Sequence, residues 1–196
     1  MNGKYYKLIR GARILQQMER ETAPLTEEST LRQLDTNTRQ FQPPSQKRQH
    51  ATGPVNIVQV QTIPFAPSGE LKVECVARSG ESGKTYHPIF MFQNVQYEQD
   101  DSQQNVSFTG HDGQEHHIIP ISLAKNNVKV RCDCLDFYHR FFPYNNRDKS
   151  LYGNVPRPYV RKTTTHAPAN PQQKPGVCKH LLAAAEALSQ TGLLVN

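Results

Sequence analysis

The sequence lacks tryptophan altogether, uses cysteine only four times in 196 residues, and contains no long run of apolar residues. A membrane-spanning helix needs about 20 consecutive, mostly apolar residues, so we expect no membrane partner. The opening segment, MNGKYYKLIRGARILQQ, carries charges through its apolar part, which is not typical of a secretory signal. We therefore expect a cytoplasmic protein that is not secreted.

The few cysteines are clustered, and their spacing argues against one common use of this residue. Cys132 and Cys134 lie two residues apart, and Cys178 precedes His180 by two residues. Small secreted domains use cysteines as a disulfide framework, which this spacing does not resemble. In a reducing cytoplasm, metal binding is the better use of clustered thiols. Cys75 stands apart in an alternating apolar segment, where we expect a small buried side chain. A free reactive thiol is the alternative there.

Residues arranged for catalysis are also missing. No serine stands in a nucleophile motif, and no pair of carboxylates is spaced for acid–base chemistry. The segment GESGKT at 80–85 ends like a phosphate-binding loop, but Arg78 stands where that motif needs a glycine. We therefore predict that the protein is not an enzyme.

The charge of the chain is unevenly distributed around a formal net charge of +6. Residues 1–50 carry 9 basic and 5 acidic residues, which gives a net charge of +4. Residues 51–130 carry 5 basic and 8 acidic residues (net −3), and residues 131–196 carry 9 and 4 (net +5). Basic flanks around an acidic middle predict anionic partners, either nucleic acid or an acidic protein surface.

The first 54 residues predict an N-terminal arm. Residues 4–20 place apolar side chains at spacings of three and four, as in an amphipathic helix, although Gly11 weakens the pattern. The apolar stripe consists of Tyr5, Leu8, Ile9, Ala12, Leu15 and Met18. Thr26 can cap a second short helix through Leu34, and residues 35–54 have the composition of a linker. A flexible arm is the alternative interpretation of residues 1–34.

The middle of the chain predicts β-strands. Alternating or β-branched segments indicate strands at 55–65, 71–77, 86–97 (broken by Pro88), 106–109, 117–121 and 128–132. Turn signals between them favour one antiparallel sheet or a small barrel. The clearest helix is LLAAAEALSQ at 181–190, which Gly192 ends. The residues expected on its inner stripe are Leu181, Leu182, Ala185 and Leu188. These segments divide the chain into an arm at 1–54, a β-rich domain at 55–126 and a final region at 127–196.

Three cysteines and one histidine of the final region form a candidate metal site. The set is Cys132, Cys134, Cys178 and His180. Thiolates and an imidazole are ligands that Zn²⁺ prefers, and four protein ligands fill its tetrahedral shell. The sequence thus predicts one structural zinc ion without an open position for a catalytic water. One alternative is a Cys-x-Cys redox pair beside an unrelated Cys-x-His. The other is replacement of a ligand by His116, His117, His139 or His166.

The spacing and flanks of these ligands resemble the SWIM-type zinc finger. That family has Cys-x-Cys, a variable gap, and then Cys-x-His at the start of a helix rich in small residues. The matching flanks here are CLDF at 134–137 and GVCKHLLAA at 176–184, and the resemblance covers about residues 127–190. It implies a β-hairpin and a helix clamped by one zinc ion, with DNA- or protein-binding roles. The gap of 43 residues between Cys134 and Cys178 is longer than is usual for the family.

The long insert at 138–177 is strongly basic, with 7 basic residues and one acidic residue. Aromatic residues are interleaved with the cations, and six prolines predict an extended loop. Stacking rings and cations are suited to single-stranded nucleic acid, whereas long loops with aromatic residues and prolines also serve protein interfaces. The candidate partner-binding residues are Arg140, Arg147, Lys149, Arg157, Tyr159, Arg161 and Lys162.

Together these features predict an α+β fold: an antiparallel β-rich body, a zinc-clamped C-terminal helix and an extended N-terminal arm. The functional hypothesis is a structural subunit of a larger assembly, which docks on protein neighbours through its arm and insert. In this layout the chain also resembles virion subunits of tailed bacteriophages, such as tail or baseplate components, which would place it in a virion. The alternative hypothesis is a nucleic-acid-binding or regulatory SWIM module.

Overall fold

The computed structural model describes residues 29–40, 54–80, 82–99, 102, 104–158, 160 and 168–196. Residues 1–28 of the predicted arm, with the helix at 4–20, lie outside these residues. The same holds for most of the predicted linker and for His166, Tyr159, Arg161 and Lys162 of the insert. The second predicted helix has Thr30 and not Thr26 as its N-cap, so its predicted start is wrong.

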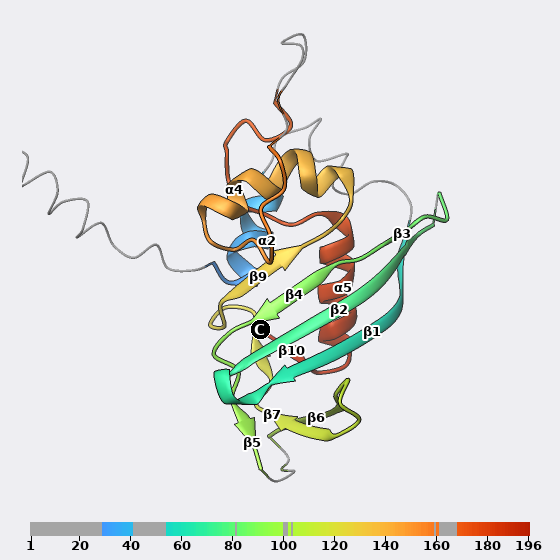
Figure 1. Ribbon diagram of the computed structural model, residues 1–196, viewed down its shortest axis with the longest axis vertical. Helices are drawn as coiled ribbons and strands as arrows, with labels where there is room; N and C mark the ends of the chain where they lie inside the picture. The colour runs from blue at the N-terminus through green and yellow to red at the C-terminus, as the bar shows by residue number, and fades with distance from the viewer. Residues whose placement is uncertain are drawn as a thin grey trace, which may run out of the picture.

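The main sheet has the strand order β1-β2-β4-β9, and all neighbouring strands in it are antiparallel (Figure 1). These strands are β1 (Val55–Phe65), β2 (Glu70–Ser79), β4 (Ile89–Phe92) and β9 (Val128–Arg131), and a short β3 (Thr85–Tyr86) pairs with the end of β2. A 3₁₀ turn, η1 (Ala66–Ser68), joins β1 to β2. The antiparallel α+β prediction is confirmed, and β1 has the bounds that its β-branched sequence predicts.

Alternation along β2 determines which face of the sheet is buried. Leu71, Val73, Cys75 and Ala77 are at most 2% exposed, while the residues between them are more exposed. The helix α5 (Lys179–Gln190) lies behind this sheet in the view of Figure 1. It buries Leu181, Ala184 and Leu188, together with His180 of its first turn. Two members of the predicted inner stripe, Leu182 and Ala185, are only half-buried, because they face away from the sheet toward a groove described below.

Two smaller sheets complete the β structure. The first has the order β5-β7-β6 and is antiparallel, with β5 (Tyr97–Glu98), β6 (Val106–Thr109) and β7 (Glu115–Ile118). The second pairs β8 (Ile121–Ser122) with β10 (Leu194–Val195) in parallel, which departs from the purely antiparallel prediction. The predicted strands at 86–97 and 117–121 are therefore each split into shorter pieces.

The helix α2 (Leu31–Arg39) begins with a complete capping box. The Thr30 hydroxyl accepts from the Gln33 backbone N–H at 3.3 Å, and the Gln33 side chain accepts from the Thr30 N–H at 2.7 Å. The helix continues five residues beyond the predicted end at Leu34, so the prediction of a linker from residue 35 is wrong at its start. The physical reason is tertiary packing, because Leu31, Leu34 and Thr38 are all buried against the rest of the molecule.

The start of the insert is helical, and the prediction of an extended loop is wrong there. A π-helical turn, η2 (Phe137–Phe141), leads into α4 (Phe142–Arg147). Phe137, Phe141 and Phe142 are all at most 2% exposed, so three aromatic side chains serve the core and cannot stack on a ligand. Pro143 lies in the first turn of α4, where a missing N–H costs no helical hydrogen bond.

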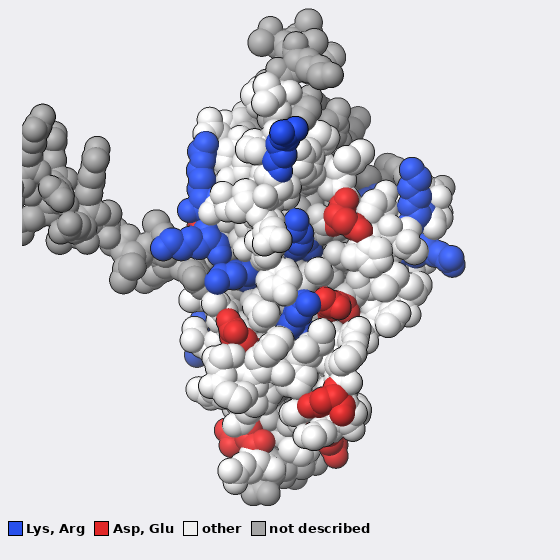
Figure 2. All heavy atoms as spheres, viewed as in Figure 1, with Lys and Arg blue, Asp and Glu red and all other residues white. Residues whose placement is uncertain are grey.

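Acidic and basic residues are unevenly distributed over one face. Figure 2 shows acidic side chains and no basic ones on the lower part of this face, over the β5-β7-β6 sheet, while basic side chains lie above it together with further acidic ones. The small sheet and its turns contribute Glu98, Asp112 and Glu115. Across the described ranges, no helix combines the length and the apolar character that crossing a membrane requires.

Candidate metal centre

Four side chains from two distant parts of the chain meet at one end of the main sheet. The last residue of β9 is Arg131, so Cys132 follows directly at the strand end, and Cys134 lies in the turn before η2. Cys178 is the N-cap residue of α5, and His180 lies in the first turn of that helix. The strand end and the helix start therefore each supply one pair of donors, as the sequence predicts.

The donor atoms of Cys132, Cys134, Cys178 and His180 all lie within 4.8 Å of one another. His180 Nδ1 is 3.8 Å from the Cys132 Sγ and 4.0 Å from the Cys178 Sγ. A tetrahedral ion with metal–sulfur bonds of about 2.3 Å and a metal–nitrogen bond of about 2.0–2.1 Å separates its ligand atoms by roughly 3.5–3.8 Å. The four donors thus surround a space for one metal ion.

The cluster is closed to solvent. The four residues are between 0% and 5% exposed, so four donors leave no side of the site open to bulk water. The Tyr86 ring stacks on the His180 ring with a centroid separation of 4.1 Å. The backbone N–H of Phe137 donates to the Cys134 Sγ at 3.3 Å, a bond that favours the thiolate form.

The pKa values of the three cysteine thiols favour a bound cation in the cluster. Hydrogen bonds from the thiols of Cys132 and Cys178 hold the pKa of Cys134 well below its usual range. The pKa of Cys132 is raised, first because its thiol donates to Cys134, and burial raises the pKa of Cys178. One thiolate thus forms readily and opposes ionisation of its neighbours. Full ionisation of all three sulfurs needs a positive ion among them.

His180 is oriented for coordination through Nδ1, the nitrogen that faces the sulfurs. Its other ring nitrogen, Nε2, is buried and has no hydrogen-bond partner among the described residues. A metal on Nδ1 fixes the tautomer that carries its proton on Nε2. Because Nε2 has no hydrogen-bond partner among the described residues, the stacking of Tyr86 on the imidazole is what holds this ring.

A second layer of contacts fixes the turn that carries Cys134. Asp133, between the first two cysteines, accepts from the His87 backbone N–H at 2.9 Å. Its other carboxylate oxygen lies 2.6 Å from His87 Nδ1. These contacts join the turn to the connection between β3 and β4, and they orient the first donor pair relative to the sheet.

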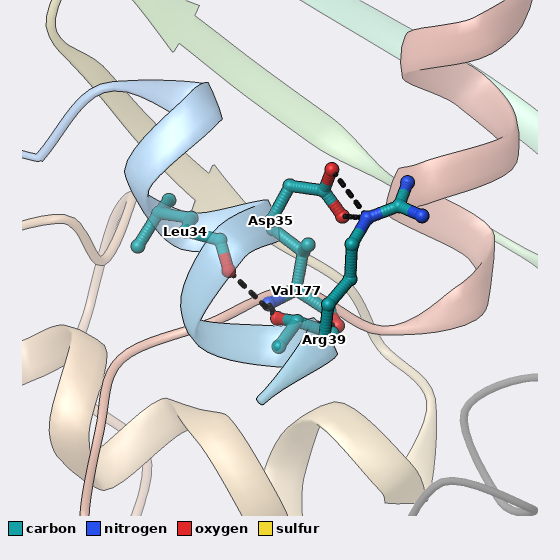
Figure 3. Close-up of polar contacts among 5 residues, drawn as sticks. Leu34, Asp35, Arg39 and Val177 are labelled. Atoms are coloured by element: carbon teal, nitrogen blue, oxygen red, sulfur yellow. Dashed lines mark hydrogen bonds and ion pairs between the residues drawn. The ribbon is translucent and has the colours of Figure 1, made fainter. Parts of the chain in front are cut away.

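The segment that leads into Cys178 is held from two sides. The Asn145 side chain accepts from the Gly176 N–H at 3.0 Å and donates to the Gly176 carbonyl at 3.1 Å. The Thr38 hydroxyl accepts from the Val177 N–H at 2.9 Å and donates to the Leu34 carbonyl at 2.7 Å. Figure 3 shows Val177 beside α2, with the hydrogen bonds of the Thr38 hydroxyl dashed. The sequence gives no signal for either contact, since each joins segments more than 30 residues apart.

Gly176 is required by close packing at this point. A Cβ added there would lie 2.6 Å from the Thr38 Oγ1 and 2.7 Å from a ring carbon of Phe141. Only glycine lets α2, η2 and the start of α5 approach one another so closely. The second donor pair is thus positioned by three elements together.

The histidines considered as replacement ligands lie elsewhere. His116 pairs with Asp112 at 3.0 Å, and His117 lies 2.8 Å from the Ser107 hydroxyl. Both histidines are on β7 of the β5-β7-β6 sheet. His139 contacts the Tyr138 ring in η2, and His166 is outside the described residues. Within the described ranges, the Cys132–Cys134–Cys178–His180 set is the one group of suitable side chains close enough to hold a metal ion.

The candidate partner-binding residues divide into two groups. Arg140 is only 1% exposed and forms an ion pair with Asp136 at 3.1 Å, so its prediction as a surface contact is wrong. The spacing of four residues between Asp136 and Arg140 is a sequence signal that could have found this helical pair. Arg147, Lys149 and Arg157 are exposed. Tyr159, Arg161 and Lys162 lie outside the described residues.

Comparisons of the chain with protein-family models, with curated proteins and with solved structures found no match.

Proposed function

We propose that the protein is a non-enzymatic structural subunit of a larger assembly, in which one structural zinc ion clamps the C-terminal helix to the sheet. The buried Cys₃His cluster carries the proposal, because four protein donors in tetrahedral reach leave no coordination position for a substrate. Three thiolates and one imidazole favour zinc among the common divalent ions. The order of the donors along the chain supports a site of the SWIM type.

The surface of the final region supports docking on protein neighbours. Leu135, Val155 and Val160 are 57–79% exposed, and all three belong to the turn and insert at 134–160. The exposure of three apolar side chains along one segment of the chain supports a docking role for that segment. The cations Arg147 and Arg157 lie along the same insert, and apolar residues with arginine are characteristic of protein interfaces.

The edge of the main sheet offers a further contact for a neighbour. β1 is the outer strand of the sheet and has no charged residue in its sequence, VNIVQVQTIPF. Val58 and Val60 on this strand are 56% and 45% exposed. Natural sheets protect open edges with charges, prolines or bulges. β1 lacks charges but has Pro64 and a bulge between Ile57 and Gln59, so its exposed valines, and not its backbone edge, support a contact with a neighbour.

A metal measurement tests the zinc part of the proposal. We expect one equivalent of zinc in the purified chain and none in Cys178→Ser, which should also melt at a lower temperature. Cys75→Ala is the matched control, because Cys75 is a buried cysteine of β2 that does not belong to the four-donor group, and it should keep its zinc. One full equivalent in Cys178→Ser with unchanged melting would contradict the proposed ligand set.

Crosslinking mass spectrometry on the native particle tests the assembly part. We expect crosslinks from Lys149 and from the arm at 1–28 to neighbouring chains. A chain that is monomeric in its native source, with crosslinks only to itself, would exclude a subunit role while leaving the zinc site intact.

The alternative function is nucleic-acid binding, and the exposed cations of the insert favour it. Arg147 is exposed and stacks on Tyr144, with its guanidinium 5.5 Å from the ring centroid. Binding to a single-stranded oligonucleotide should weaken with salt. The logarithm of the binding constant should fall by about 0.7 for each phosphate contact when the salt concentration rises tenfold. Arg147→Gln with Arg157→Gln should reduce that slope, whereas Lys84→Gln on the distant β2–β3 turn should not. No binding at low salt would exclude this alternative.

A further inference from the structure

A groove between α2 and α5 has an apolar floor that the fold leaves partly uncovered. Its cavity volume is 380 Å³, and Leu31, Leu123, Leu182 and Ala185 contribute its apolar lining. Leu182 and Ala185 are the two members of the apolar stripe of α5 that the sheet does not bury. The described residues therefore cover only part of the apolar stripe on α5.

Charged side chains form the rim of this groove. Asp35 and Arg39 on α2 pair with each other at 2.8 Å, and Figure 3 shows the Arg39 side chain extending toward α5. Glu186 on α5 is exposed and has no hydrogen-bond or ion-pair partner among the described residues. An apolar floor with a charged rim is suited to an amphipathic helix laid along the groove.

The N-terminal sequence of the chain has the residue pattern of such a helix. Residues 4–20 have one apolar stripe and otherwise carry 5 basic residues and one acidic residue, a net charge of +4. A positive helix can offer a cation to Glu186 at the rim. Arg32 and Arg39 balance Asp35 and Glu186 in the groove lining, so these side chains give no net positive charge that would repel the helix.

The length of the chain allows this segment to reach the groove. The described chain begins at Ser29, and Leu31 already lies on the groove floor. A helix of residues 4–20 is about 26 Å long at 1.5 Å per residue. The eight residues 21–28 span up to about 27 Å when extended. A short tether of this kind gives an effective concentration on the order of millimolar.

We propose that residues 4–20 form an amphipathic helix that docks its apolar stripe into the α2–α5 groove of the same chain. The groove is then an internal docking site for the arm, and the arm of the free subunit is held on its own body. This proposal does not rest on the assembly role or on zinc.

Hydrogen–deuterium exchange on the full chain tests the docking. We expect amides within residues 8–18 to exchange about tenfold more slowly than in an undocked arm, as expected for a locally stable element. Leu182→Glu places a charge on the groove floor and should remove that protection. Val155→Glu is the matched control, since Val155 is exposed outside the groove, and it should leave the protection unchanged.

Photo-crosslinking identifies the site and the chain that is contacted. A benzophenone amino acid at Leu8, on the apolar stripe, should crosslink to α2 or α5. The same probe at Gln17, on the opposite helix face, should not. Mixed isotopically light and heavy protein should give crosslinks within one chain only. Absent protection in the unaltered chain, protection that survives Leu182→Glu, or crosslinks between light and heavy chains would each overturn the proposal.

Discussion

Single buried polar residues decide how the metal site is positioned. Thr38 is 0% exposed, and its hydroxyl contacts the segment immediately before Cys178. A side chain on α2 thus orients a ligand that lies 140 residues further along the chain.

Replacement of Thr38 by valine keeps the side-chain shape and removes the hydroxyl. The Val177 N–H then has no acceptor in a buried environment, so we expect a loss of about 1–3 kcal/mol in the free energy of unfolding. Thr38→Ser keeps the hydroxyl and loses one methyl group, which costs about 0.8 kcal/mol. Urea unfolding measures both variants. Amide exchange at Val177 should accelerate only in Thr38→Val, and equal exchange in the two variants would contradict the assigned bond.

The Cys75 thiol should lower the stability of the folded protein at alkaline pH. Burial raises the pKa of its thiol to about 12, from an ordinary value near 9.0. Between these two values the unfolded chain has lost the proton that the folded chain keeps, so stability falls as pH rises from about 9 toward 12. At pH 10.5 this loss reaches about 2 kcal/mol at 1.36 kcal/mol per pH unit.

The alkaline loss should be smaller in Cys75→Ala, which has no thiol to ionise. Unfolding free energies at pH 8 and pH 10.5 give the comparison, with each variant referred to its own value at pH 8. The burial of Tyr97 also raises its pKa to about 12, so a residual alkaline loss remains in the variant. An identical decrease in both proteins would show that Cys75 does not contribute.

At the scale of elements, α2 depends on its capping box. Thr30→Ala removes the side-chain acceptor for the Gln33 N–H and should cost about 0.5–2 kcal/mol. Thr30→Ser keeps the acceptor and should cost less. Amide exchange in the first turn of α2 is the measurement, and equal rates in the two variants would refute the role of the cap.

The elements also show which structural features follow from sequence pattern. The bounds of β1 and the burial alternation of β2 are predictable because side-chain period and β-branching report a strand directly. The donor set is predictable because ligand types and helix onset lie within a few residues of each other. Each of these signals is local.

Features set by distant packing were not predictable. The six prolines spread through the insert predict an extended chain, yet burial of Phe137 and Phe141 makes its start helical. The extension of α2 to Arg39 depends on Val177, which lies far away in the sequence. On α5, Leu181 and Leu188 are buried as predicted, whereas Leu182 and Ala185 face a groove that no local pattern reveals.

At the scale of the whole molecule, one hydrophobic core joins the three predicted regions. It includes Leu34 of α2, Phe90 of β4 and Leu188 of α5, and β9 of the final region completes the main sheet. A metal ion bound at the end of this sheet would therefore stabilise the fold as a unit.

Stability should follow the concentration of free zinc. An ion that binds only the folded chain adds about 1.4 kcal/mol per tenfold excess over its dissociation constant. Acid should reverse this gain, since protons compete with the metal for three thiolates. Thermal melting in zinc-buffered solutions measures the effect, with calcium at equal concentrations as the control. A melting temperature that is independent of free zinc would contradict a structural role.

The contact between Asn145 and Gly176 has a consequence for how this sequence can change over evolutionary time. It closes the base of the insert, so both ends of the intervening chain start from fixed points beside the metal ligands. Doubling the length of a flexible loop costs only about 0.6 kcal/mol. Related chains can therefore gain or lose residues between Leu151 and Asn170, which are themselves buried, while the four ligands keep their places. The number of residues in this gap is the least informative feature by which to recognise a relative.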